Sequence, residues 1–128
     1  MSNTLYDALF APHADVDRAF LQSDDATELT FAGFVRRAAQ LAHVLAGAGI
    51  TPGDRVLVQA PKVSDTIALY AACVQAGAVY LPLNTAYTQA ELAYFIADAT
   101  PRVVVCDSQD KTAMQMLCDG RDVTVLTL

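Results

Sequence analysis

The residue types that most often bind metals or act as nucleophiles are few in this sequence. Two histidines, His13 and His43, stand far apart, and no third ligand lies at a spacing that zinc sites use. The cysteines are odd in number and form no Cys-x-x-Cys pair, which favours buried, inert thiols in a reducing compartment; they are Cys73, Cys106 and Cys118. We therefore predict neither a metal site nor a catalytic residue in this chain.

Known local phosphate-binding motifs are also missing from the sequence. Gly47, Gly49 and Gly53 close a helical segment, whereas the glycines of a dinucleotide motif follow a strand and open a helix. No GxxxxGK[ST] loop is present. Ser64 precedes Asp65 and has no evident basic partner, so this pair predicts a helix N-cap rather than a nucleophile.

One loop is a candidate for ligand binding. Residues Pro82–Thr88 (PLNTAYT) connect the end of a predicted strand to the start of a predicted helix. Open parallel sheets bind ligands outside the carboxyl ends of their strands, and helix N-termini attract anions. The residues alone favour a simpler interpretation, in which Pro82 ends the strand and Asn84 shapes the turn.

Segments rich in Val and Leu alternate with segments of helical period, which indicates parallel strands joined by crossover helices. The predicted strands are Arg55–Gln59, Ala78–Leu81, Arg102–Cys106 and Val123–Leu128. Each intervening helix is expected to bury one face: Ile67, Tyr70, Ala71 and Val74 in the first, Leu92, Phe95, Ile96 and Ala99 in the second, with Met114 and Leu117 beginning the third. The sequence thus predicts an α/β fold, mainly a parallel sheet with helices on both faces.

An amphipathic helix and a small N-terminal unit precede this alternation. Apolar residues recur every three or four positions after Thr30, which is expected to cap the helix, and Gly49 marks its end. Before it, the patterns predict a short helix at Thr4–Phe10 and a β-hairpin formed by Arg18–Ser23 and Glu28–Phe31.

Further along, residue types mark the ends of the later helices. Thr88 and Glu91 fit a capping box, in which the hydroxyl and the carboxylate each accept a main-chain N–H. Gly77 and Gly120 stand where helices reverse into strands, a position that favours a residue with positive φ.

The bulk composition excludes several partner classes. The chain has 128 residues, a net charge of −6 and a pI near 4.5, so it cannot neutralise a row of nucleic-acid phosphates. No apolar run reaches the roughly 18 residues of a membrane helix, and the first twenty residues do not match a signal peptide. These features predict a cytoplasmic protein without membrane or nucleic-acid partners.

Two segments resemble the opening of adenylate-forming enzymes. They are ELTFAGFVRRAAQLAHVLAGAGITPGDRV (residues 28–56) and AACVQAGAVYLPLN (residues 71–84), and they stand at the expected separation. Within that superfamily of acyl-CoA synthetases, VYLPLNTAYTQAELAYFIADATPRVVV (residues 79–105) is most similar to malonyl-CoA synthetases. Gly33 departs from the pattern, since many relatives carry an acidic residue there.

This resemblance implies a two-step ligation. ATP and a carboxylate, here malonate, form an acyl-adenylate, and the thiol of coenzyme A then displaces AMP; Mg²⁺ accompanies ATP. The family's phosphate loop, nucleotide contacts and catalytic lysine belong to later segments. We therefore expect residues 1–128 to be an N-terminal fragment of the large domain, inactive and without bound cofactor. Because the last residues, VTVLTL, resemble a core strand with nothing after it, we also expect truncation and self-association through exposed apolar surface.

The resemblance also suggests site residues. In some related synthetases the loop matching Asn84, Thr85 and Ala86 borders the coenzyme A entrance, and the helix start near Lys111 approaches its phosphorylated nucleotide. Lys111 could equally be a solvated surface lysine. Two other functions stay open: a ligase for short- or medium-chain fatty acids, and a free-standing, flavodoxin-like binding module.

Overall fold

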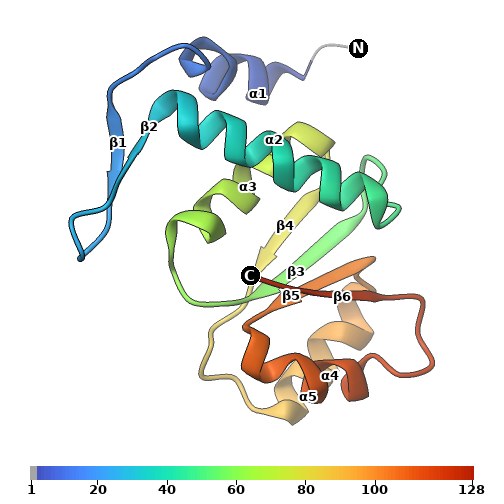
Figure 1. The fold of residues 1–128 in the computed structure, drawn as a ribbon. Helices are drawn as coiled ribbons and strands as arrows, with labels where there is room; N and C mark the ends of the chain where they lie inside the picture. The colour runs from blue at the N-terminus through green and yellow to red at the C-terminus, as the bar shows by residue number, and fades with distance from the viewer. Residues whose placement is uncertain (1–2) are drawn as a thin grey trace.

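A four-stranded parallel sheet forms the centre of residues 3–128, the part of the chain that the computed structural model describes (Figure 1). Its strands lie in the order β4-β3-β5-β6 and are β3 (Arg55–Gln59), β4 (Val79–Pro82), β5 (Val103–Cys106) and β6 (Thr124–Thr127). All neighbouring pairs are parallel. The predicted α/β fold is confirmed. The observed ends of the strands differ from the predicted ends by no more than one residue.

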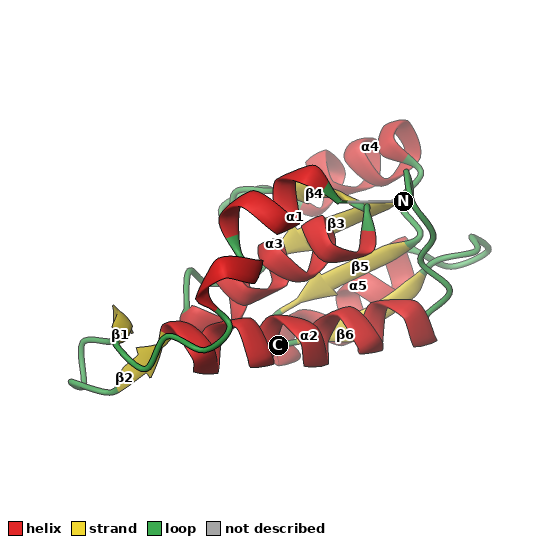
Figure 2. Cartoon of the chain, turned by 90° about the horizontal axis from the view of Figure 1, so that it is seen from above, coloured by secondary structure: helices red, strands yellow, loops and turns green. Residues whose placement is uncertain are grey.

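Helices cover both faces of this sheet, as Figures 1 and 2 show. One face carries α2 (Phe31–Gly47) and α3 (Ser64–Ala76), and the other carries α4 (Gln89–Ala99) and α5 (Lys111–Leu117), which follows a short 3-10 turn, η2 (Ser108–Asp110). Covered on both sides, β5 buries all four of its residues. This burial explains the unbroken apolar run of its sequence.

The two faces enclose separate cores of different size. On the α2–α3 face, sixteen buried residues form one cluster, with Phe34, Leu45 and Leu69 among the largest. On the α4–α5 face the buried cluster has seven members: Leu57, Leu92, Ile96, Val104, Cys106, Met114 and Cys118. Successive residues of β3 and β5 supply both clusters because strand side chains alternate between faces.

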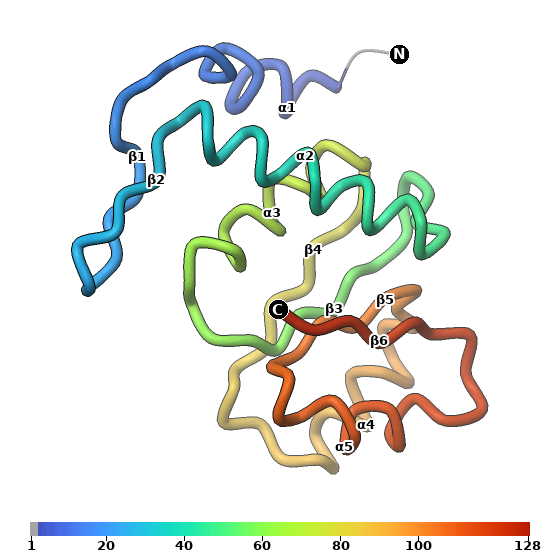
Figure 3. The backbone as a smooth tube through the Cα atoms, viewed as in Figure 1, coloured from blue at the N-terminus to red at the C-terminus, as the bar shows by residue number. Residues whose placement is uncertain are grey.

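The N-terminal unit packs beside α2 and α3. It consists of α1 (Thr4–Leu9), η1 (Ala11–His13) and an antiparallel hairpin of β1 (Ala19–Gln22) and β2 (Glu28–Thr30). The side-chain amide of Asn3 donates to Val74 O at 2.6 Å and so ties the start of α1 to the end of α3. Figure 3 shows the hairpin projecting beyond the first turns of α2, away from the sheet. The predicted helix and hairpin are confirmed.

The predicted helix ends are confirmed in four places. Thr30 Oγ1 accepts the N–H of Gly33 at 3.0 Å at the start of α2. Before α4, Thr88 Oγ1 accepts the N–H of Glu91 at 3.3 Å, and the Glu91 carboxylate accepts the N–H of Thr88 at 2.7 Å. Gly77 has φ +71° where α3 turns back toward β4, and Gly120 has φ +74° after α5. A Cβ at Gly77 would also lie 3.2 Å from the Pro52 side chain.

Two expectations for α3 are wrong. Ser64 is the first helical residue, not the cap; the hydroxyl of Thr66 instead accepts the N–H of Val63 and donates to Pro61 O. Ile67 and Tyr70 were expected on the buried face but are 42% and 41% exposed.

The buried face of α3 is built mostly from small residues. It comprises Ala68, Leu69, Ala71, Ala72 and Cys73, which pack in the cluster that also contains the buried residues of α2. The helix is apolar almost all round, so periodicity cannot distinguish its faces. Small side chains let two helices approach closely, and the larger ones lie at the margin, where the Tyr70 ring meets that of Tyr80 edge-on at 5.5 Å.

Strand β6 forms one edge of the sheet. The residues Thr124 and Leu128 donate their N–H groups to Arg102 O and Cys106 O, at 3.1 and 3.2 Å. Because the main-chain groups of a strand alternate in direction, those of Val125 point away from β5. None of the helices within residues 3–128 is long and apolar enough to cross a membrane.

Candidate functional site

The carboxyl ends of β3, β4 and β5 meet at one edge of the sheet. The chain leaves β3 toward α3 on one face and leaves β5 toward α5 on the other, so the loops diverge between these two neighbouring strands. Doubly wound sheets bind ligands at such switch points. The predicted loop of Asn84, Thr85 and Ala86 follows β4 at this same edge.

A buried glutamine ties this loop to the sheet. Gln59, the last residue of β3, is 6% exposed, and its Nε2 donates to Asn84 O at 3.0 Å. The main chain next to it is also fixed, because Leu83 N–H donates to Val58 O at 2.8 Å. The loop therefore starts from two hydrogen bonds to the central strand.

The loop itself is a compact turn. Tyr87 N–H donates to Asn84 O at 3.1 Å, and Asn84 Oδ1 accepts the N–H of Ala86 at 2.9 Å. An asparagine that accepts from its own loop in this way is a common turn former. The turn leads directly into the Thr88 cap of α4, so both ends of the loop are held.

A small cavity lies beside this turn. It has a volume of about 140 Å³ and is lined by Gln59, Thr85, Tyr87, Gln89, Leu92, Asp110, Ala113, Met114 and Leu117. The structure thus brings Thr85 together with the start of α5, although the sequence separates them widely. The cavity is lined by apolar side chains together with amide, hydroxyl and carboxylate groups, and it is smaller than a typical small-molecule pocket.

Lys111, the first residue of α5, is exposed and does not line this cavity. Asp107 and Asp110 precede it closely; Asp107 Oδ1 accepts the N–H of Gln109 at 3.1 Å. Two carboxylates beside one ammonium group leave the local charge negative, which lowers its attraction for a phosphate.

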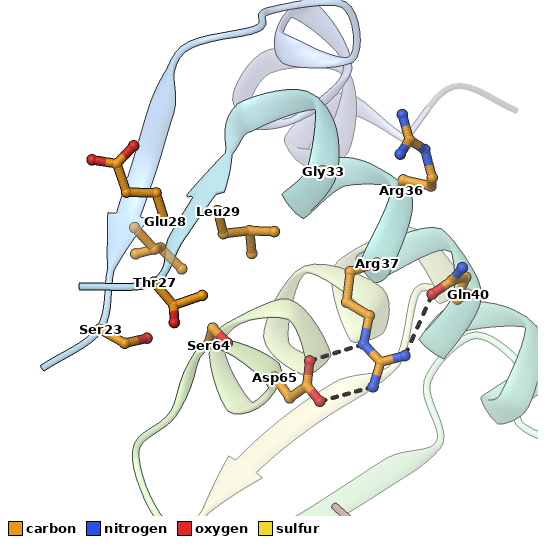
Figure 4. Close-up of a pocket in the computed structure, with 11 residues that line it drawn as sticks. Ser23, Thr27, Glu28, Leu29, Gly33, Arg36, Arg37, Gln40, Ser64 and Asp65 are labelled. Carbon is orange, nitrogen blue, oxygen red and sulfur yellow. Dashed lines mark hydrogen bonds and ion pairs between the residues drawn. The ribbon is translucent and has the colours of Figure 1, made fainter. Parts of the chain in front are cut away.

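A second hollow lies between the hairpin, α2 and α3, with a volume of about 380 Å³ (Figure 4). Inside it, Arg37 Nε and Nη2 donate to the two oxygens of Asp65, both at 2.8 Å. These hydrogen bonds hold the pKa of the Asp65 carboxyl below its usual value of 3.8 and raise the pKa of Arg37. Arg36 points away from the pair (Figure 4). Because the guanidinium of Arg37 is already hydrogen-bonded to Asp65, we interpret this pair as a structural joint between α2 and α3 rather than as a ligand-binding group.

The cysteines cannot serve as nucleophiles. All three are free thiols and buried. Burial raises the pKa of Cys73 to about 12 and that of Cys106 to about 11, and it also raises that of Cys118. The thiolate is the nucleophilic form, so these shifts suppress reactivity near neutral pH. Among residues 3–128, no group of three His, Cys, Asp or Glu side chains could hold a metal ion.

Sequence reasoning missed two features of these sites. Gln59 ends a strand pattern, and nothing in a single sequence marks an amide that will be buried against a distant loop. The Arg37–Asp65 pair joins residues 28 positions apart through helix packing. An acidic residue at a helix start was visible in the sequence, but its partner was not.

Comparisons with known proteins agree on one family. The family described as AMP-binding enzyme matches residues 11–128. Feruloyl-CoA synthase from Amycolatopsis sp is 36% identical over 114 residues, which are 89% of this chain and 22% of that protein. A nonribosomal peptide synthetase of Salinispora arenicola, the probable non-canonical CymA, is 34% identical over 90 residues, 70% of this chain and 1% of that protein.

Solved structures of related enzymes also superpose on this chain. The crystal structure of apo MatB from Rhodopseudomonas palustris superposes with a TM-score of 0.92 at 40% sequence identity, covering 100% of this chain and 26% of that chain. A structure of MatB with ATP bound gives a TM-score of 0.93 at the same identity. The chain therefore spans about a quarter of the length of these relatives.

Proposed function

Since the chain belongs to the family of AMP-binding enzymes, we propose that it is the N-terminal part of the large domain of an acid–thiol ligase that makes malonyl-CoA. In the proposed reaction a malonate oxygen attacks the α-phosphorus of ATP and releases pyrophosphate. The sulfur of coenzyme A then attacks the acyl carbon and releases AMP. Mg²⁺ would accompany ATP, and the nucleotide and metal contacts would belong to segments beyond residues 1–128.

The observation that carries the proposal is the match to MatB, which extends over all of this chain at 40% identity. It agrees with the resemblance of residues 79–105 to malonyl-CoA synthetases. An aromatic acid is the second candidate, because feruloyl-CoA synthase is 36% identical over 114 residues. A short- or medium-chain fatty acid is a third possibility within the same reaction class.

Within this proposal, the chain supplies scaffold and one wall of the coenzyme A side. The turn at Asn84, Thr85 and Ala86 lies at the switch-point edge and offers main-chain groups and one hydroxyl to a ligand. Lys111 fits a phosphate less well, since Asp107 and Asp110 stand beside it. In this proposal the triphosphate contacts belong to later segments, so we expect the 128-residue chain alone to be inactive.

The test is acid-dependent exchange of pyrophosphate into ATP, which reports the first half-reaction without coenzyme A. A ligase that carries this segment should exchange with malonate at least tenfold faster than with ferulate or butyrate, whereas the 128-residue chain should give no signal. Faster exchange with ferulate or butyrate would replace malonate as the substrate. No exchange with any acid would overturn the ligase assignment.

A further inference from the structure

We propose that Gln59 is the positioning residue for the Asn84–Ala86 turn and thereby sets the affinity for coenzyme A. The inference rests on the proposed function, in which this turn borders the coenzyme A entrance. The positioning itself rests only on contacts in this chain.

The burial of Gln59 needs an explanation. Within residues 3–128, Gln59 and Thr66 are the only buried polar side chains, at 6% and 8% exposed. An amide costs free energy to bury unless it forms hydrogen bonds. Thr66 has a local structural role at the start of α3, whereas Gln59 reaches across to a loop 25 positions away.

The hydrogen bond of Gln59 falls on the atom that organises the turn. Asn84 O accepts both Gln59 Nε2 at 3.0 Å and Tyr87 N–H at 3.1 Å. One donor comes from the rigid central strand and the other closes the turn. Without Gln59, the turn would lose its side-chain link to β3, and its internal hydrogen bonds would open more often.

The environment makes this link specific. Gln59 stands on the inner strand β3, between β4 and β5, and its own main chain pairs with Cys106 of β5. It also lines the cavity that Thr85 and Asp110 share. No hydrogen bond within residues 3–128 reaches Gln59 Oε1, so only the donor end of the amide is committed to the fold.

The test uses Gln59→Met, which keeps the length and shape of the side chain but removes the donor. Gln109→Met is the matched control, since Gln109 is exposed at the same edge of the sheet and its side chain forms no hydrogen bond within the described residues. In the 128-residue chain, hydrogen exchange at Ala86 and Tyr87 should become at least tenfold faster in Gln59→Met. The hydrogen-exchange rate of the Ala48 amide, at the end of α2, should change less than twofold. This comparison distinguishes local loosening of the turn from global unfolding.

The second readout is kinetic and uses the ligase that carries this segment. Gln59→Met should raise KM for coenzyme A about tenfold and leave malonate-dependent pyrophosphate exchange within twofold, while Gln109→Met changes neither. A purely structural role would lower both half-reactions together.

The outcomes separate the two proposals. Unchanged hydrogen exchange at Ala86 and Tyr87 in Gln59→Met overturns the positioning role. Faster hydrogen exchange at these amides with an unchanged KM for coenzyme A overturns the link to coenzyme A. A wild-type ligase without acid-dependent exchange overturns the proposed function, and the amide measurements still report whether Gln59 positions the turn.

Discussion

The two faces of the sheet differ in how they are built. The α2–α3 face has a helix of 17 residues, a helix of 13 residues and a cluster of sixteen buried residues. A bidentate ion pair between Arg37 and Asp65 joins its two helices. The α4–α5 face has helices of 11 and 7 residues and seven buried residues. It also carries the cavity beside the Asn84–Ala86 turn.

This difference separates stability from ligand access. Large apolar clusters supply most of the free energy of folding, so the α2–α3 face should be the last part of the chain to open. A face with a smaller core can open with less loss of buried area. The candidate site therefore lies on the side of the molecule whose elements can move more easily.

Thiol reactivity should show the contrast most strongly, because each face buries cysteine. At pH 8 we expect alkylation of native Cys73 to be about a thousandfold slower than in the unfolded chain, since burial raises its pKa from 9.0 to about 12. Cys106 should be about a hundredfold slower, its pKa rising to about 11. On the α4–α5 face, Cys118 should be the fastest of the three.

Iodoacetamide labelling followed by mass spectrometry measures these rates, with the chain in denaturant as the control. A native Cys73 that reacts faster than Cys118 would reverse the proposed order of opening.

Core truncation gives the next largest effect. Leu45 on the α2–α3 face is 1% exposed, and Leu45→Ala should lower the free energy of unfolding by about 3 kcal/mol through lost burial and a new cavity. Leu117 is half-buried at the existing cavity, so Leu117→Ala should cost only about 1 kcal/mol. Urea titration monitored by circular dichroism gives both values. Equal losses would mean that the two cores are equally tight.

The Arg37–Asp65 joint should give the smallest effect. Its side chains are 41% and 35% exposed, so Asp65→Asn should cost about 0.5 kcal/mol at pH 7. The folded pKa of Asp65 lies below its usual 3.8, so the contribution is full above that value and is lost as the pH falls through the folded pKa. The stabilities of the variant and the parent should therefore converge once the pH falls below the folded pKa of Asp65.

Asp122→Asn is the matched control, because the Arg102–Asp122 pair is a single contact of 3.0 Å with Asp122 91% exposed. It should change stability by less than Asp65→Asn at every pH. A larger loss in this control would show that the joint between α2 and α3 has no special role.

Much of this architecture was predictable because it depends on local chemistry. Thr30 and Thr88 cap helices through hydroxyls that bond the next turn, and Gly77 permits a positive φ. These signals act over a few residues and can be read from one sequence. The unbroken apolar sequence of β5 likewise indicates a strand that is covered by helices on both faces.

The remainder depended on partners distant in the chain. In α3, the exposure of Ile67 and Tyr70 follows from the close approach of α2, which selects the side with small residues. Gln59 became a site residue only when β4 placed Asn84 beside it. The placement of the turn could be predicted from the order of strand and helix, but the contact that fixes it could not.

The outer strand β6 has a consequence for how the chain behaves in bulk solution. Its residues, Thr124–Thr127, include neither a charge nor a proline, the two devices that commonly block lateral pairing at a sheet margin. The outward amide and carbonyl of Val125 are thus open to a further β-ladder. We therefore expect concentrated samples of the 128-residue chain to associate by adding strands at this edge, a behaviour that is separate from the stability of the fold.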